Sequence, residues 1–339
     1  MTSKALSLSV LDIVPVAVGS DTATALRNTI DLARLADGLG FTRYWIAERH
    51  GREASTGSAP DVIVSHVATQ TVQIRVGVGG IFLPDHNVTS VVETFRVLNA
   101  LHPGRVDLGI DRSNVLEDIR RSGLGASSVD RDSAAVPAEL EQLLAIFKGN
   151  VLADDSPGRA VLVPKSGEPP IWLIGFDVES ARLAARCGIG FVYAHYLEPV
   201  DVGRALQVYR SEFRRSSSFA TPHAFIAAVV ICAETDSRAS ELASTMALEW
   251  LQIEEGREML FPSVEMAAQF PYTGEERRKI DAIQQRMFVG SASKLVKRLT
   301  VLATECEVAE IMILTVTHDH PARRQSYQLL AEACARQSA

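Results

Sequence analysis

Short apolar runs rich in β-branched and aromatic residues alternate with helix-like segments along almost the whole chain. The strand-like runs cover residues 6–14, 41–47, 74–83, 105–110, 170–175, 190–195, 223–233 and 310–315. Such near-continuous apolar strands are typical of a parallel sheet that is buried on both faces. Eight strand–helix units in a chain of 339 residues favour a (β/α)8 TIM barrel over a doubly wound sheet. We therefore predict the α/β class, with a single barrel domain over residues 1–339.

Helical spacing of apolar residues fills most of the segments between these strands. The predicted helices cover residues 22–39, 60–71, 88–102, 134–148, 178–187, 199–215, 236–254, 292–306 and 321–336. Two stretches interrupt the pattern before the fifth strand. We interpret residues 112–128, which are rich in Ser and Gly, as a long loop, and residues 159–163 as an inserted strand.

A third interruption, residues 255–290, mixes Pro, Gly and charged residues. It also carries large apolar side chains, namely Met259, Phe261, Phe270, Tyr272 and Met287. The segment is either a lid that excludes solvent from the barrel mouth or a surface insertion that packs on the barrel or on a second subunit. The sequence leaves both interpretations open.

Charge and cysteine content argue against several classes of partner. The net charge is −7 and no basic cluster is present, so we expect no nucleic-acid partner. The four cysteines lack CxxC spacing, which argues against a zinc site and a disulfide framework. No apolar run approaches the roughly 18 residues of a membrane span, and no signal-peptide pattern precedes the first strand. We expect a cytoplasmic protein that does not bind membranes.

Ionisable residues follow several predicted strands, at the end where the active sites of barrels lie. In chain order they are Asp12, Glu48, Arg49, His50, Asp85, His86, Asp111, Arg112, Asp177, Glu179, His195, Tyr196, His318 and Asp319. His50 is either a titrating group or a histidine that is hydrogen-bonded at a strand end. Glu48 and Arg49 are either site residues or an ion pair. Arg112 is either a surface arginine or an anion-binding residue, since its guanidinium matches phosphate oxygens.

Two further sequence patterns do not indicate a functional site. The glycines of residues 77–80 lie inside a strand with no helix start behind them, so close backbone packing is favoured over a phosphate loop. His318 and His320 have no third ligand nearby, and we expect no metal site. The residues alone indicate a barrel with an ionisable rim and do not name a reaction.

Seven stretches nevertheless resemble the bacterial luciferase-like monooxygenases, in the order of that family and over nearly the whole chain. They are SVLDIVPV (9–16), LADGLGFTRYWIAERH (35–50), IRVGVGGIFLPDH (74–86), RVLNALHPGRVDLGIDR (96–112), PIWLIG (170–175), VGSASKLVKRL (289–299) and SYQLLAEA (326–333). The resemblance implies a barrel that usually dimerises. It also implies reduced FMN, supplied by a separate flavin reductase and used to activate O2. Substrates of the family include aldehydes, ketones and aromatic polyketide-like molecules, and some relatives use F420 instead.

The resemblance also assigns catalytic candidates after the second strand. The family motif there ends Glu-His-His, and this chain has Glu48, Arg49 and His50. The first histidine of the motif carries the acid/base role, and Arg49 stands in its place. Arginine stays protonated at working pH, so it cannot shuttle a proton. His50 is the remaining acid/base candidate.

The cofactor-binding candidates implied by the resemblance are Arg112, Asp111, Gly79 and Ser180. Arg112 matches the arginine that binds the flavin phosphate, and Asp111 replaces a small neutral residue. After the fifth strand, the family has hydroxyl residues against this phosphate. This chain has instead Phe176, Asp177 and Glu179, with Ser180 beside them. A phosphate dianion at this site would meet carboxylates unless they are turned away or neutralised.

The predicted function is therefore a flavin-dependent monooxygenase that acts with reduced FMN and O2 on a small hydrophobic biosynthetic intermediate. Two alternatives remain. The barrel could have lost flavin and act as a redox-neutral cyclase or isomerase, or it could be a non-catalytic partner subunit. Phe176 and Glu179 favour the alternatives, whereas Arg112 and the intact motifs of the third and eighth strands favour the monooxygenase.

Overall fold

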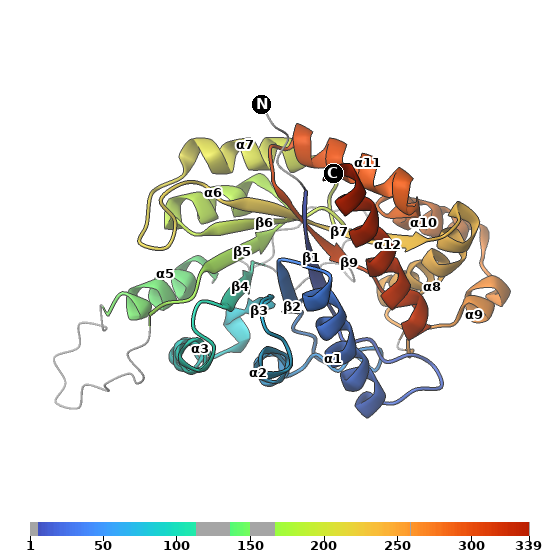
Figure 1. Ribbon diagram of the computed structural model, residues 1–339, viewed down its shortest axis with the longest axis horizontal. Coiled ribbons are helices and arrows are strands. Elements are labelled where there is room, and N and C mark those ends of the chain that lie inside the picture. The colour runs from blue at the N-terminus through green and yellow to red at the C-terminus, as the bar shows by residue number, and fades with distance from the viewer. Residues whose placement is uncertain (1–5, 113–135, 150–166, 258, 339) are drawn as a thin grey trace.

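The computed structural model describes residues 6–112, 136–149, 167–257 and 259–338. Eight parallel strands close into a barrel, because β1 to β7 pair in sequence order and β9 bridges β7 and β1 (Figure 1). The predicted (β/α)8 barrel is confirmed. The strands of the described ranges are β1 (Ser7–Asp12), β2 (Arg43–Ile46), β3 (Arg75–Phe82), β4 (Val106–Asp111), β5 (Ile171–Gly175), β6 (Gly190–Ala194), β7 (Ala224–Ala233), β8 (Phe288–Ser291) and β9 (Glu310–Leu314).

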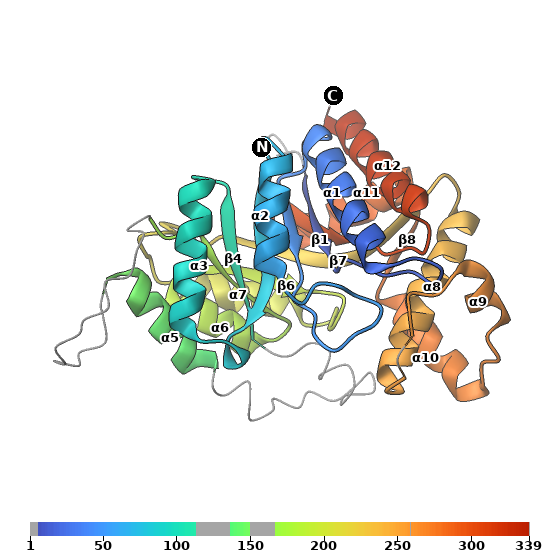
Figure 2. The same ribbon diagram turned by 90° about the horizontal axis from the view of Figure 1, so that it is seen from below.

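Helices follow the barrel strands and form the outer layer (Figure 2). They are α1 (Thr22–Gly38), α2 (Pro60–Gln70), α3 (Val88–Leu101), α5 (Val136–Phe147), α6 (Val178–Cys187), α7 (Val202–Glu212), α8 (Asp236–Glu254), α9 (Val264–Gln269), α10 (Gly274–Gln285), α11 (Ala292–Glu305) and α12 (His320–Ser338), with a short 3-10 turn η1 (Leu83–Asp85). None of the helices in these ranges is both long and apolar enough to cross a membrane. The predicted strand 159–163 and, apart from residue 112, the predicted loop 112–128 lie outside the described residues.

Strand β2 shows how side chains divide between the barrel interior and the helix layer. Trp45 points inward and contacts the rings of Trp172 and Phe225, at centroid distances of 6.1 and 5.5 Å. Its neighbours Tyr44 and Ile46 point outward into the layer between strands and helices. All are fully buried, which explains why the strands read as continuous apolar runs.

Gly79 lets β3 pass close to this interior. A Cβ atom added at Gly79 would lie 2.7 Å from Cε3 of Trp45 and 3.2 Å from Cδ1 of Leu11. Real Cβ contacts are longer, so only glycine fits without rearrangement. The prediction of close packing in this stretch is confirmed.

The amino-terminal end of the barrel is closed by a buried ionic network. Arg43 donates to Asp107 at 2.7 Å and to Glu310 at 2.8 Å, and all three side chains are at most 7% exposed. The guanidinium also stacks over the ring of Trp172 at 4.7 Å. Every charge in the network has partners, as buried charges require. This end is therefore a structural plug, which leaves the carboxyl ends of the strands as the open side for chemistry.

The segment 255–290 contains secondary structure that was not predicted from the sequence, namely α9, α10 and the start of β8. Strand β8 pairs in parallel with Val230–Ala233, the part of β7 that extends beyond its pairing with β9. Phe261 and Met287 are buried in the same cluster as the barrel interior. In both views this region lies beside α8, on the side away from α3 and α5 (Figures 1 and 2). The segment packs on the barrel as a wall, and its opening as a lid stays a prediction.

Candidate active site

The three predicted catalytic residues, Glu48, Arg49 and His50, follow β2 and point to two different sides of the chain. The chain stays extended past Ile46, since the Ala47 amide donates to the Asp12 carbonyl at 2.9 Å. Trp45 and Ala47 belong to the interior cluster, so the same alternation directs Arg49 over the barrel interior. Glu48 and His50 follow the opposite, outward side. The structure therefore brings Glu48 and His50 together and places Arg49 apart from them.

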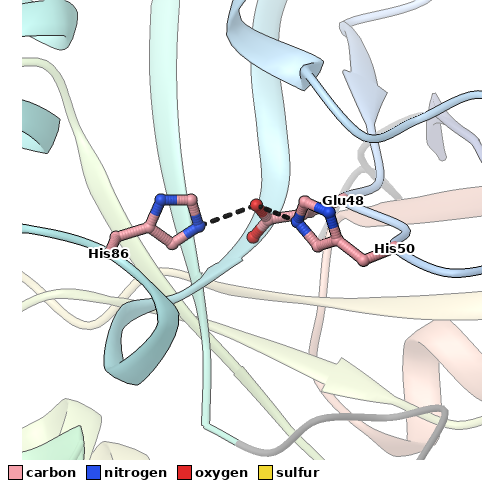
Figure 3. A group of neighbouring side chains, drawn as sticks. All are labelled: Glu48, His50 and His86. Atoms are coloured by element: carbon pink, nitrogen blue, oxygen red, sulfur yellow. Dashed lines mark hydrogen bonds and ion pairs between the residues drawn. The ribbon is translucent and has the colours of Figure 1, made fainter.

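On the outward side, Glu48 joins two histidines (Figure 3). Its Oε1 accepts a hydrogen bond from Nε2 of His50 at 2.9 Å and another from Nε2 of His86 at 2.7 Å. Its Oε2 accepts the backbone N–H of Phe82 at 3.1 Å. His86 ends the η1 turn after β3, the strand beside β2. The sequence places His86 at a strand end but does not pair it with Glu48.

The protonation of this cluster follows from its burial and its hydrogen bonds. Burial alone would raise the pKa of Glu48, but the hydrogen bonds from His86 and His50 hold it below its usual value. The hydrogen bond to Glu48 raises the pKa of His86, against the opposing effect of burial. The Glu48 side chain is 6% exposed, that of His86 30% and that of His50 53%. The hydrogen bonds thus favour the charged forms of Glu48 and His86, and His50 is the more accessible of the two histidines.

The same three side chains have the composition of a cation site. One ligand atom from each of Glu48, His50 and His86 lies within 4.8 Å of the others. Two histidines and a carboxylate can hold a transition metal. His318 and His320, by contrast, are used elsewhere: His318 bonds the carbonyl of Val18 at 2.9 Å and His320 bonds Asp31 at 2.8 Å.

Arg49 lies among charged and aromatic groups over the interior. Burial lowers its pKa, and the nearby carboxylate of Glu249 and the phenol of Tyr196 act in the opposite direction. Asp111, at the end of β4, also interacts with it electrostatically. Among the described residues the Arg49 guanidinium forms no hydrogen bond, whereas its backbone N–H donates to Gly57 at 3.1 Å. A partly buried guanidinium whose donors have no partner among the described residues can hold a negatively charged oxygen.

The predicted phosphate position, by contrast, already holds an anion. Arg112 Nη1 donates to Oδ1 of Asp177 at 2.8 Å and contacts Oγ of Ser180 at 2.9 Å. Asp177 is the N-cap of α6, where Oδ1 accepts the Ser180 N–H at 2.6 Å and the Ser180 hydroxyl at 2.7 Å. The Nε atom of Arg112 is buried and has no hydrogen-bond partner in the part of the chain that the structure describes. With Asp177 in this place, these residues do not fit a phosphate dianion.

Glu179 takes no part in this arrangement. Its carboxylate is 60% exposed and pairs with Arg182 on the surface of α6. Of the two acidic residues that follow β5, Glu179 is turned away and Asp177 is turned inward onto Arg112. Gly175 makes the inward position compact, because a Cβ there would lie 2.3 Å from the Ser180 side chain.

Two other ionisable residues at strand ends serve the framework. Asp12 is fully buried and accepts hydrogen bonds from Tyr44, from Thr29 at 2.8 Å and from Arg323 at 2.8 Å. This ion pair attaches α12 to β1. His195 is also buried, and burial lowers its pKa to about 4, so it is neutral near pH 7.

Comparison with known proteins gives one consistent result. A sequence model of the luciferase-like monooxygenases matches residues 7–316. The Bacillus subtilis (strain 168) protein YceB is 36% identical over 96% of this chain and 99% of its own length. A luciferase-like monooxygenase of Escherichia coli (strain K12) is 31% identical over 97% of each chain.

Solved structures agree with these sequence relationships. The crystal structure of apo-MsnO8 superimposes with a TM-score of 0.84 at 34% identity, over 98% of both chains. The oxygenating constituent of 3,6-diketocamphane monooxygenase from Pseudomonas putida, solved in complex with FMN, gives a TM-score of 0.70 at 18% identity. It covers 98% of this chain and 99% of its own, and at this identity the likeness concerns the fold alone.

Proposed function

The chain belongs to the luciferase-like monooxygenase family, and from this premise we propose that it is a flavin-dependent monooxygenase acting with reduced FMN and O2. Membership makes it an oxidoreductase; the cofactor and the substrate class are the proposal. The substrate would be a hydrophobic aldehyde, a ketone or an aromatic polyketide-like intermediate. A bound reduced flavin would supply the electrons that activate O2. The FMN bound to the fold relative from Pseudomonas putida supports FMN as the first choice, with F420 as the alternative.

The observation that carries this proposal is the position of Arg49 over the barrel interior. The guanidinium is partly buried, forms no hydrogen bond among the described residues, and lies near Tyr196 and Glu249. A fixed cation stabilises negative charge on a substrate oxygen, as an enolate or phenolate would carry, and requires no proton transfer of its own. We assign this role to Arg49. His50 and Glu48 would exchange protons with solvent at the rim.

The proposed cofactor site lies at the carboxyl ends of β3, β4 and β5. The ring of the cofactor would lie near Gly79 and Asp111, and Arg112 and Ser180 would border its polar end. A separate flavin reductase would deliver the reduced cofactor, and the chain would act as a homodimer. A cytoplasmic location fits both requirements.

An anaerobic titration of the purified protein with reduced FMN, with F420 in parallel, tests the cofactor. We expect saturable binding in the micromolar range. Candidate aldehydes, ketones and aromatic substrates are then supplied with O2 and a flavin reductase, and oxygenated products are identified by mass. The absence of binding for both cofactors at high micromolar concentration would refute the monooxygenase.

A pair of variants tests the role of Arg49. Arg49→Lys keeps the positive charge and Arg49→Met keeps much of the volume without it. We expect Arg49→Met to lower kcat about 100-fold or more, and Arg49→Lys to lower it less, because charge stabilisation acts in the transition state. Equal losses in both variants would show that shape, not charge, is what matters at this position.

One observation favours a second candidate function. The anion position formed by Arg112 already contains Asp177, as expected for a barrel that no longer depends on a phosphorylated flavin. Such a chain would be a redox-neutral cyclase or isomerase, or a non-catalytic subunit. A product with the same mass as its substrate, formed without reductant, would identify the isomerase or cyclase.

A further inference from the structure

The amino-terminal end of α6 and Arg112 together have the properties of an anion site. The helix directs its first N–H groups and the positive end of its dipole toward the carboxyl ends of β4 and β5. Arg112 follows β4, and its backbone N–H is bonded to the carbonyl of Ile174 on β5 at 3.1 Å. A guanidinium beside a helix amino terminus binds carboxylate or phosphate oxygens well.

The chain fills this site with its own carboxylate. Asp177 Oδ1 accepts from Arg112, from the Ser180 N–H and from the Ser180 hydroxyl, all between 2.6 and 2.8 Å. One oxygen therefore occupies three donors that an incoming anion could use, namely Arg112 Nη1, the Ser180 N–H and the Ser180 hydroxyl. The Asp177 side chain is still 34% exposed and Arg112 is 13% exposed, so the position remains open to solvent from one side.

From this geometry we infer that Asp177 is a built-in substitute for a ligand phosphate, so that the protein does not select its flavin by the phosphate group. The inference rests on the proposed flavin dependence and deepens it. A phosphate dianion near Asp177 would meet a like charge and would find the Arg112 donor engaged. Riboflavin has the same ring and ribityl chain as FMN and lacks only the phosphate, so the two flavins should bind with similar affinity.

The charge balance explains the direction of the effect. Arg112 and the helix dipole supply about one and a half positive charges, and Asp177 neutralises one of them. The remaining attraction is too weak to hold a dianion tightly. Glu179 does not contribute to this balance, because its carboxylate is directed to the surface and pairs there with Arg182.

The test compares the affinities of reduced FMN and reduced riboflavin, measured anaerobically by fluorescence and absorbance, in the native protein and two variants. Asp177→Asn removes the charge but keeps an oxygen that can cap α6, so the helix should stay intact. Glu179→Gln removes a charge from the same helix turn and is the matched control. Far-ultraviolet circular dichroism checks that both variants are folded.

In the native protein we expect the two flavins to bind within about threefold of each other, since the phosphate gains no net contact. In Asp177→Asn, FMN should bind about tenfold more tightly while riboflavin is unchanged, because a partly exposed like-charge contact has been removed. Glu179→Gln should change neither affinity. FMN binding about 100-fold tighter than riboflavin in the native protein would overturn the inference and leave the flavin enzyme standing.

Inorganic phosphate separates this inference from the proposed function. If neither flavin binds, the proposed function fails, but the anion site can still be tested by titrating phosphate into the native protein and into Asp177→Asn. Binding to the variant and not to the native protein would support the built-in anion. Equal phosphate binding in both, or binding in neither, would overturn it.

Discussion

Replacing Glu48 by Gln removes the negative charge that interacts with His50 and His86 while keeping the size of the side chain. In the native protein one oxygen, Oε1, accepts from His86 at 2.7 Å and from His50 at 2.9 Å. Two unit charges 4 Å apart attract by about 1 kcal/mol in water and about 4 kcal/mol at an effective dielectric of 20. The His86 side chain is 30% exposed, so we take a value near the lower limit, about 1.5 kcal/mol. Loss of this attraction lowers the pKa of His86.

The expected result is therefore a lower pKa of His86 in the Glu48→Gln variant than in the native protein, because the hydrogen bond to the Glu48 carboxylate is what raises it. The assay is an NMR titration of the imidazole signals, with His86→Asn used to assign the resonance. A His86 pKa that is the same in the native protein and in Glu48→Gln would refute the argument, because it would show that the two side chains do not meet in solution.

The same cluster sets a pH window for stability. The pKa of His86 is raised, so its contribution is fully present below its ordinary value of 6.5 and is lost as the pH rises through the folded-state pKa. The pKa of Glu48 is lowered, so its contribution is present above its ordinary value of 4.5 and is lost as the pH falls through the folded-state pKa. Urea unfolding should therefore show the largest difference between native protein and Glu48→Gln between these two values.

Three further changes have direct structural reasons. Arg323→Met should lower the free energy of unfolding by about 3–5 kcal/mol in urea titrations, because it leaves the buried Asp12 without its cation, and adding Asp12→Asn should recover part of the loss. Gly79→Ala should lower the same quantity by about 1–3 kcal/mol, since its Cβ would meet Trp45 at 2.7 Å; an unchanged value would show that the interior can yield. Prolonged dialysis against a chelator should leave the melting temperature unchanged, because Glu48 is already hydrogen-bonded to two histidines; a fall would reveal a bound cation.

The barrel could be predicted because its strands carry their own signal. Each is buried on both faces and reads as an apolar run, and helices fill the gaps between them. Strand β8 has no such signal: it is four residues long, includes Gly290, and among the described strands it pairs with the extended end of β7 alone. Its formation depends on the length of β7, a tertiary property that local sequence does not encode.

The candidate site was only partly predictable for a related reason. Alternation along a strand separates Arg49 from Glu48 and His50, and the sequence shows this. The partner His86 belongs to another strand end, and its meeting with Glu48 depends on the neighbouring positions of β2 and β3 in the barrel. A useful signal was available, because consecutive strands of a (β/α)8 barrel are adjacent and their carboxyl ends share one rim.

The orientations of the two acidic residues after β5 could also be predicted from the sequence. Asp177 directly precedes a predicted helix, and aspartate at that position turns its side chain back onto the first N–H groups of the helix. Glu179 lies in the first turn, where its longer side chain reaches Arg182. Capping chemistry therefore separates two carboxylates that charge counting alone treats as equivalent.

Arg49 and Asp177 together move positive charge from the rim of the site toward the barrel interior. Compared with a motif that has a titratable histidine and a hydroxyl at these two positions, the chain gains a permanent positive charge over the interior and a negative charge at the end of β5. Opposite changes at two places leave the total charge of the site nearly constant while moving the favourable position for an anion from the rim to the centre. A ligand that carries its negative charge on the reacting part is then favoured over one that carries it on a distant phosphate. The Arg49 and Asp177 variants test the two halves of this argument independently, since one reads out turnover and the other reads out the ratio of two flavin affinities.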